Sequence, residues 1–179
     1  MLILGAACSF APTRLVVLQH GLYGEAINMQ VLQQELISAG GDDVLCHLAE
    51  GNEGALTRDG VAAGGRRLAD EIRALVTHTP SLKSLSLVGN SLGGLYARYA
   101  AAELLDDDGR MAGLTPDALC TIGCPHLGVR RYLYLSLPTR LCATLGPAVA
   151  GQTARELLLR DDERRPLLVR MCEGRHAAA

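Results

Sequence analysis

The sequence predicts an α/β fold, in which a mostly parallel sheet carries helices on both of its faces. Short runs of branched apolar residues alternate along the chain with longer segments whose apolar positions recur at helical spacing. This alternation indicates successive β-α-β units, whose crossovers are almost always right-handed. With 49% hydrophobic and 20% charged residues in 179 positions, the chain has the composition of one folded domain. We expect a short tail over residues 1–13 and this single domain over residues 14–179.

Two strands and two helices are predicted in the first half of the chain. Residues 14–19, RLVVLQ, indicate a buried parallel strand that leads into the loop HGLYGE. Residues 27–37 predict a helix that AGG ends, with these apolar residues at helical spacing: Ile27, Val31, Leu32, Leu36 and Ile37. Residues 43–49, DVLCHLA, predict the second strand. After the polar loop EGNEGALTRDG, residues 65–78 predict a helix with one apolar face, formed by Leu68, Ile72, Leu75 and Val76.

The second half supplies two more strands around another helix. SLSLVG over residues 84–89 predicts the third strand, and Ser91 stands at its exit. A helix then runs through LYARYAAAELL to the acidic surface turn DDDGR. ALCTIG over residues 118–123 predicts the fourth strand, and CPHLG predicts the loop after it. His20, Ser91 and His126 therefore follow the carboxyl ends of parallel strands, where open α/β sheets bind their ligands.

Charge, hydropathy and cysteine usage exclude several classes of function. The net charge is −2 and the arginines are scattered, so the chain shows no basic patch for nucleic acid. No run reaches the roughly 18 apolar residues of a membrane span, and residues 131–151, which come nearest, are interrupted by Pro138, Arg140 and Pro147. The apolar opening lacks the basic region of a signal peptide. Six cysteines form no C-x-x-C pair, so we expect no metal site and instead reduced, mostly buried thiols in the cytoplasm.

Ser91 lies between glycines at the end of an apolar run, where either a catalytic serine or a turn residue would fit. Gly89, Asn90, Ser91, Leu92 and Gly93 match the G-x-S-x-G nucleophile elbow, in which a serine occupies a strained turn from strand to helix. Larger side chains at the two glycines would collide with the neighbouring strand and helix. An apolar strand before the motif and a helix after it form the context in which it indicates a catalytic nucleophile.

Two segments can supply hydrogen-bond donors for a developing oxyanion. The helix that begins near Leu92 directs unpaired backbone N–H groups toward the serine. The loop HGLYG after the first strand is at the topological position of a second donor. A simple glycine turn would account for the same loop.

Four segments together resemble the putative serine esterase family of eukaryotic lipase-like α/β-hydrolases: VVLQHGLYG, LVGNSLGGLYARYA, TIGCPHLGV and GQTARELLLRDDERRPLLVRM. They occur in the family's order and span residues 14–171. The resemblance implies an α/β-hydrolase-type sheet and hydrolysis of lipid or acyl esters without a cofactor. It also implies that Ser91 is the nucleophile and that the backbone N–H groups of Leu22 and Leu92 are the oxyanion donors. The residues expected to shape the site are His20, Gly21, Gly89, Asn90, Gly93 and His126.

The same resemblance exposes a departure from the family pattern. The family's catalytic acid and general-base histidine lie downstream of the segment similar to LLLRDDERRPLLVRM, whereas this sequence stops at CEGRHAAA. We therefore expect a sheet truncated after the strand that follows the nucleophile helix. The general base and its acid are unassigned. Candidates within the chain are His126 and His176 as bases, and Asp161, Asp162 and Glu163 as acids.

Truncation would leave the fourth predicted strand as a bare apolar edge, which invites pairing and aggregation. Residues 132–151 are apolar and would either pack over that edge or form a lid or acyl-binding wall. The leading hypothesis is a lipase-like serine esterase whose partner is a lipid or acyl-ester substrate. One alternative is a catalytically dead hydrolase fold that binds lipid or another protein, and another is an incomplete gene model. The sequence leaves open peripheral membrane contact and the oligomeric state.

Overall fold

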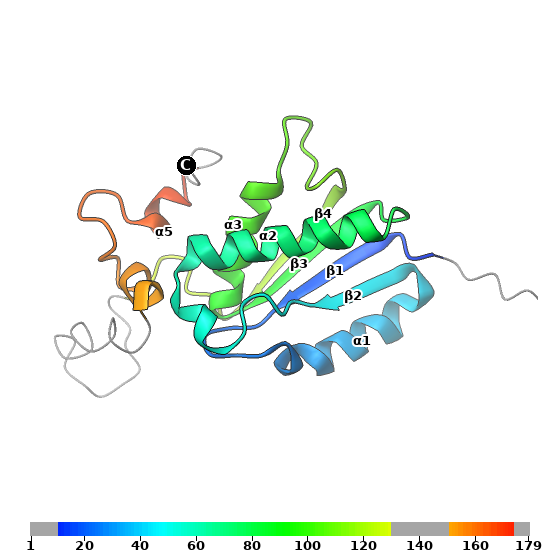
Figure 1. Ribbon diagram of the computed structural model, residues 1–179, viewed down its shortest axis with the longest axis horizontal. Helices are drawn as coiled ribbons and strands as arrows, with labels where there is room; N and C mark the ends of the chain where they lie inside the picture. Colours follow the sequence, from blue (N-terminus) through cyan, green and yellow to red (C-terminus); the bar gives the residue numbers. More distant parts are fainter. Residues whose placement is uncertain (1–10, 130–150, 174–179) are drawn as a thin grey trace, which may run out of the picture.

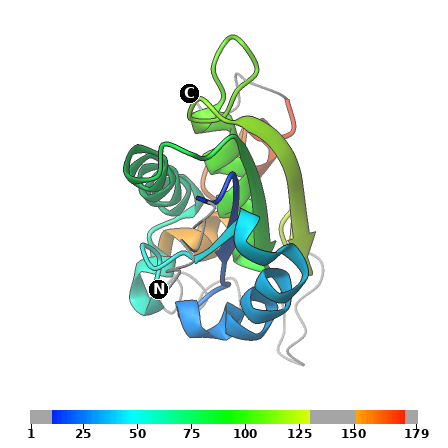
Figure 2. The ribbon, with the colours of Figure 1, turned by 90° about the vertical axis from the view of Figure 1, so that its right-hand side faces the viewer.

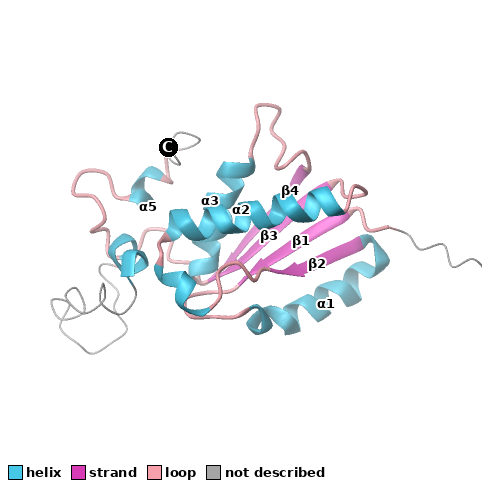
Figure 3. Ribbon diagram, in the orientation of Figure 1, coloured by secondary structure: helices cyan, strands magenta, loops and turns pink. Residues whose placement is uncertain are grey.

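A parallel four-stranded sheet forms the centre of the computed structural model, which describes residues 11–129 and 151–173. The strand order is β2-β1-β3-β4 (Figure 1, Figure 3). The strands are β1 (Arg14–Gln19), β2 (Val44–Leu48), β3 (Ser84–Asn90) and β4 (Thr115–Ile122). The prediction of an α/β fold with a mostly parallel sheet is confirmed.

Helices connect the strands and cover both faces of the sheet. They are α1 (Gln30–Gly40), α2 (Val61–His78), α3 (Leu92–Leu104) and the short α5 (Leu167–Arg170). Residues 151–157 are also helical, and the connections contain the 3-10 helices η1 (Ala26–Met29), η2 (Gly41–Asp43) and η3 (Gly54–Arg58). Helix α1 packs on one face, and α2 and α3 pack on the other (Figure 2). None of the described helices is both long and apolar enough to cross a membrane.

The two faces follow from the handedness of the crossovers. The chain moves from β1 outward to β2, then returns past β1 to β3 and β4. Since such crossovers are almost always right-handed, this reversal of direction accounts for the position of α1 opposite α2 and α3. It also places the carboxyl ends of β1 and β3 side by side, at the point where ligands bind in such sheets.

Strand β1 is buried on both faces. Leu15 and Val17 contribute to the core beneath α2 and α3, whereas Val16 and Leu18 pack on the side of α1. The exposed fraction of each of these four side chains is 7% or less. The continuous apolar run in the sequence is therefore the signature of a parallel strand covered on two sides.

The prediction that the apolar residues of segment 27–37 share one face of a helix is partly wrong. The 3-10 helix η1 precedes α1, which begins at Gln30. Leu32 and Leu36 are four residues apart and share one face of α1, whereas Val31 and Ile37 are each about 100° around the helix from one of them. Ile27 and Val31 are 56% and 73% exposed, and Ile37 is exposed as well. The side chains that pack on this face of the sheet are Met29, Leu32 and Leu36.

Strand β4 forms one edge of the sheet and is exposed along most of its length. Leu119 and Ile122 are 48% and 46% exposed, so the described part of the chain has the predicted bare apolar edge. The strand begins three residues earlier than predicted, at Thr115, and Pro116 is tolerated within it because an edge strand has one unpaired side. Residues 132–151 were predicted to cover this edge. Of this segment, residues 132–150 lie outside the described residues.

The described cysteines differ in their exposure. Cys46 is buried and Cys124 is half-buried, whereas Cys120 and Cys172 are exposed. The prediction of mostly buried thiols is therefore wrong for two of these four residues. Cys120 is exposed because it lies on the edge strand, and Cys172 because it lies in the turn after α5.

Candidate active site

The chain reverses sharply at Ser91, between β3 and α3. Ser91 has φ 53° and ψ −123°, in the region of positive φ that residues with a side chain rarely adopt. Its backbone N–H donates to the carbonyl oxygen of Ile122 at 2.7 Å, which ties the turn to the end of β4. Such backbone strain costs roughly 1–3 kcal/mol and persists where the surrounding structure enforces it.

Two glycines make this turn sterically possible. A methyl group on Gly89 would lie 2.4 Å from the carbonyl oxygen of Gly93 and from the backbone of Gly94. A methyl group on Gly93 would lie 2.4 Å from the carbonyl oxygens of Gln19 and His20. These distances are far below van der Waals contact, so the close approach of β1, β3 and α3 requires glycine at both positions.

The loop after β1 lies against Ser91. A methyl group on Gly21 would lie 2.9 Å from Ser91 Cβ and 3.4 Å from Ser91 Oγ. The next residue in this loop, Leu22, donates no backbone hydrogen bond to a described residue, and neither does Leu92 at the start of α3. Two N–H groups that have no acceptor among the described residues therefore lie on the segments that meet at Ser91. Donors in such an arrangement can stabilise an oxyanion.

His126 follows β4, and both of its ring nitrogens are engaged. Arg98 Nη1 lies 3.0 Å from Nδ1, and Thr121 Oγ1 lies 3.0 Å from Nε2. Because a guanidinium can only donate, Nδ1 accepts, and the neutral ring donates its Nε2–H to Thr121. Burial lowers the pKa of His126, and the charge of Arg98 lowers it further. These contacts orient the loop after β4 and leave neither nitrogen for Ser91.

His20 is fully buried at the start of the loop that approaches Ser91. Its Nδ1 lies 3.0 Å from the carbonyl oxygen of Gly21, and a methyl group on Gly24 would lie 2.9 Å from the same nitrogen. Its Nε2 has no hydrogen-bond partner among the described residues. His20 therefore packs inside the turn from Gly21 to Gly24 and shapes it.

The carboxylates considered as catalytic acids occupy local turns. Asp161 accepts a backbone N–H at the start of α5 at 2.7 Å, and Asp162 accepts two backbone N–H groups at 2.8 Å. Those two hydrogen bonds hold the pKa of Asp162 below its usual value. Glu163 is exposed, and His176 lies outside the described residues. Within the described ranges, no side chain forms a hydrogen bond with Ser91 Oγ, so the structure does not assign a general base.

Two buried polar residues lie in the stretch EGNEGALTRDG, where the sequence predicts only a loop. Asn52 and Thr57 are fully buried, and η3 occupies part of the stretch. Asn52 Nδ2 donates to Gln19 Oε1 at 3.0 Å, and Thr57 Oγ1 accepts the backbone N–H of Tyr23 at 3.0 Å. Asn and Thr are common in exposed loops, so no local pattern marks these two residues. Their partners are distant in the sequence and become visible in the folded chain.

The comparison with protein families decides what kind of protein this is. The family model described as Putative serine esterase (DUF676) matches residues 10–178. The chain belongs to this family. Membership in the DUF676 family agrees with the resemblance found in the sequence and supports a hydrolase-type function.

Solved structures and curated proteins add little to the family assignment. The chain is similar to a protein described as a putative hydrolase from Agrobacterium vitis S4, with 22% sequence identity and a TM-score of 0.49. The match covers 76% of this chain and 52% of that protein, so this DUF676 chain spans about half the length of that hydrolase. The comparison with curated proteins found no match.

Proposed function

We propose that this DUF676 chain is a serine hydrolase that cleaves carboxylic esters, with Ser91 as the nucleophile. One observation carries the proposal: the loop after β1 lies against the strained turn, with Gly21 beside Ser91. The N–H groups of Leu22 and Leu92, which donate to no described residue, lie on these two segments. Family membership supports the hydrolase-type reaction.

In the proposed reaction, Ser91 Oγ attacks the carbonyl carbon of the ester, and the serine proton passes to a base. The carbonyl oxygen then carries a negative charge, which the N–H groups of Leu22 and Leu92 and the positive end of α3 stabilise. Collapse of this intermediate breaks the bond to the alcohol, which leaves with a proton. Water then attacks the acyl-serine and releases the carboxylic acid.

Exposed apolar side chains on the loops around the turn favour an apolar acyl group. Leu22 and Tyr23 follow β1, Leu56 lies on η3 and Leu127 follows β4, with exposed fractions between 37% and 72%. Contact with an acyl chain would remove this apolar surface from water. We therefore propose a lipid or acyl ester as substrate, with peripheral contact to a lipid surface. The free thiols of the described cysteines favour the reducing cytoplasm as its setting.

A second candidate function is lipid binding without turnover. One observation favours it: His126 is held by Arg98 and Thr121, and no described histidine forms a hydrogen bond with Ser91 Oγ. Without a base histidine, a serine hydrolase loses about a million-fold in turnover. A chain in that state would keep the apolar loops and bind acyl groups without a covalent intermediate.

Labelling with a fluorophosphonate probe, which reacts covalently with activated serines, tests both functions on the purified, folded chain. We expect the wild type to be labelled and Ser91→Ala to lose the label. Ser86→Ala is the matched control, because Ser86 lies on β3, the strand that leads to Ser91, and its hydroxyl donates to Asp117 Oδ2. Equal labelling of Ser91→Ala would contradict the proposed nucleophile. A folded wild type that takes no label but binds a fatty acid would favour the second function.

A further inference from the structure

The loop after β1 needs a restraint from outside the loop. Tyr23 has φ 53°, which is an unfavourable conformation for an aromatic residue and requires support from its surroundings. Its backbone N–H donates to Thr57 Oγ1 at 3.0 Å. The preceding residue, Leu22, carries the N–H proposed as an oxyanion donor. The orientation of that N–H therefore depends on how firmly Tyr23 is held.

Thr57 is suited to hold this loop because its hydroxyl both accepts and donates a hydrogen bond. Its Oγ1 accepts the N–H of Tyr23 and donates to the carbonyl oxygen of Gly54 at 2.7 Å. The side chain has no exposed surface, so water does not compete for either hydrogen bond. A second contact joins the same two segments, since the N–H of Gly54 donates to the carbonyl oxygen of Gly24 at 2.9 Å.

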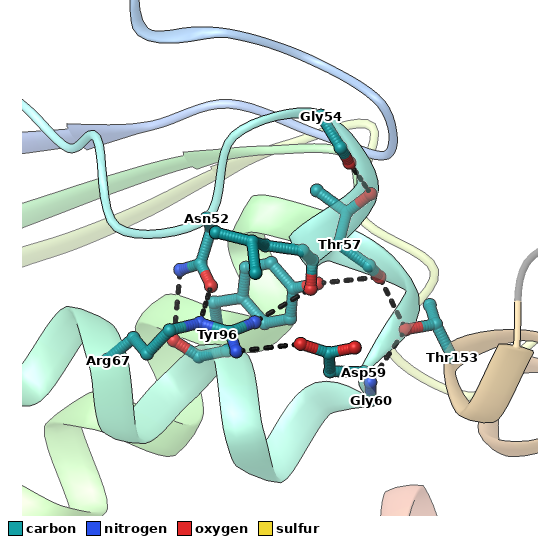
Figure 4. Close-up of polar contacts among 10 residues, drawn as sticks. Asn52, Gly54, Thr57, Asp59, Gly60, Arg67, Tyr96 and Thr153 are labelled. Carbon is teal, nitrogen blue, oxygen red and sulfur yellow. Dashed lines mark hydrogen bonds and ion pairs between the residues drawn. The ribbon is translucent and has the colours of Figure 1, made fainter.

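The backbone of Thr57 is held from the other side by the helix that follows the nucleophile. Tyr96 Oη, on α3, donates to the carbonyl oxygen of Thr57 at 3.0 Å, and Thr153 Oγ1 donates to the same oxygen at 2.5 Å (Figure 4). Tyr96 is fully buried and lies about one turn beyond Leu92 on the same helix. Thr57 therefore joins the loop that carries Leu22 to the helix that carries Leu92.

We propose that Thr57 is a positioning residue for the oxyanion hole, which fixes the N–H of Leu22 relative to that of Leu92. The inference rests on the proposed function of Ser91. Donors stabilise an oxyanion best when they are oriented before the reaction begins. A displacement of about 1 Å in a catalytic group can cost roughly 100-fold in rate. Thr57 acts through Tyr23 and does not contact the substrate.

The test replaces the hydroxyl of Thr57 while preserving its shape. Thr57→Val removes both hydrogen bonds of Oγ1, and Thr57→Ser keeps them. We expect Thr57→Val to lower kcat for 4-nitrophenyl butyrate at least about tenfold, with KM changed less than about twofold, because the loss is confined to the transition state. Thr57→Ser should restore kcat to within about threefold of the wild type. Thr57→Ala replaces Thr57→Val if the valine variant does not fold.

A matched control separates positioning from general loss of stability. Ser81→Ala removes a hydroxyl that donates to the carbonyl oxygen of Pro12 at 2.7 Å, just before β1 and at the other end of the strand from the serine turn. We expect it to lower the melting temperature, with kcat near that of the wild type. Equal losses of kcat in Thr57→Val and Ser81→Ala, or an unchanged kcat in Thr57→Val, would overturn the proposal.

Amide hydrogen exchange tests the role of Thr57 independently of the proposed function. In Thr57→Val, the segment over residues 20–26 should exchange about tenfold faster or more, because the N–H of Tyr23 loses its acceptor. Unchanged exchange in this segment would contradict the claim that the hydroxyl of Thr57 restrains Tyr23. If the wild type shows no turnover that depends on Ser91, the proposed function fails, and the exchange result alone decides whether Thr57 positions the loop.

Discussion

The backbone N–H of Ser91 donates to the carbonyl oxygen of Ile122, the last residue of β4, at 2.7 Å. The pairing between β3 and β4 therefore continues one residue beyond Asn90, into the turn itself. Because Ser91 has a positive φ, its conformation needs support from its surroundings. The hydrogen bond to Ile122 gives it support from the neighbouring strand, in addition to that from α3. The position of the proposed nucleophile consequently depends on an edge strand that is largely exposed to solvent.

Gly93→Ala should destabilise the fold through direct steric collision. The added methyl group would lie 2.4 Å from two carbonyl oxygens of the backbone, at Gln19 and His20, and backbone cannot move away as a flexible side chain can. We expect a loss of about 3 kcal/mol in the free energy of unfolding, at the upper end for overpacked sites. Urea denaturation measures it, with Gly51→Ala as the control, because there the nearest atom is a side-chain oxygen of Glu71 at 3.1 Å. Equal unfolding free energies in the two variants would contradict this account.

Arg98→Met should raise the pKa of His126. The charge of Arg98 lowers this pKa together with burial, so its removal shifts the pKa toward the usual value of about 6.5. NMR titration of the His126 ring measures the change. Arg73→Met is the control, because Arg73 lies on exposed α2 surface beside Asp70. A His126 pKa that falls or stays constant in Arg98→Met would rule out the hydrogen bond from Arg98 to Nδ1.

Glu156 should make stability depend on pH. Its carboxylate is buried and accepts the N–H of Val61 at the start of α2, at 2.5 Å. Burial raises the pKa of Glu156 above the value of 4.5 expected when unfolded. Between these two pKa values the folded chain binds more protons than the unfolded chain, so the stability contributed by this group is lost as pH rises through the folded pKa.

Glu156→Gln removes this titration while keeping an oxygen that can accept the N–H of Val61. We expect the melting temperature of the wild type, relative to the variant, to fall as pH is raised from 4.5 toward 8. Thermal melts of both proteins in the same buffers measure the difference, which cancels the contributions of other groups. A difference that grows in favour of the wild type with rising pH would contradict the raised pKa.

Leu119→Lys should reduce self-association of the chain. Leu119 is 48% exposed on β4, and a charged side chain on an edge strand disfavours pairing with another edge. Light scattering of concentrated samples measures the association, and Leu127→Lys is the control because it changes an exposed leucine away from the strand. Equal association of the wild type and Leu119→Lys would show that the edge does not drive it.

The sequence by itself determined the features that arise from neighbouring residues. The apolar runs located the four strands of the described part of the chain, the spacing of Leu68 and Ile72 identified the buried face of α2, and the glycines around Ser91 indicated the turn. These features depend on backbone propensity and on local periodicity, which a short window of sequence contains. Val31 shows the limit of this reasoning, because it is adjacent to Leu32 in α1 and therefore points away from the sheet on which Leu32 packs.

Only the tertiary structure decided which polar groups meet. Thr57 and Tyr23 are 34 residues apart and Arg98 and His126 are 28 apart, yet each pair forms a hydrogen bond in the folded chain. No periodicity encodes such a pairing, because it depends on how β1, η3 and α3 pack together. The sequence therefore located the candidate nucleophile. Packing determined which side chains hold the loop beside it, and that both ring nitrogens of His126 are hydrogen-bonded to other residues.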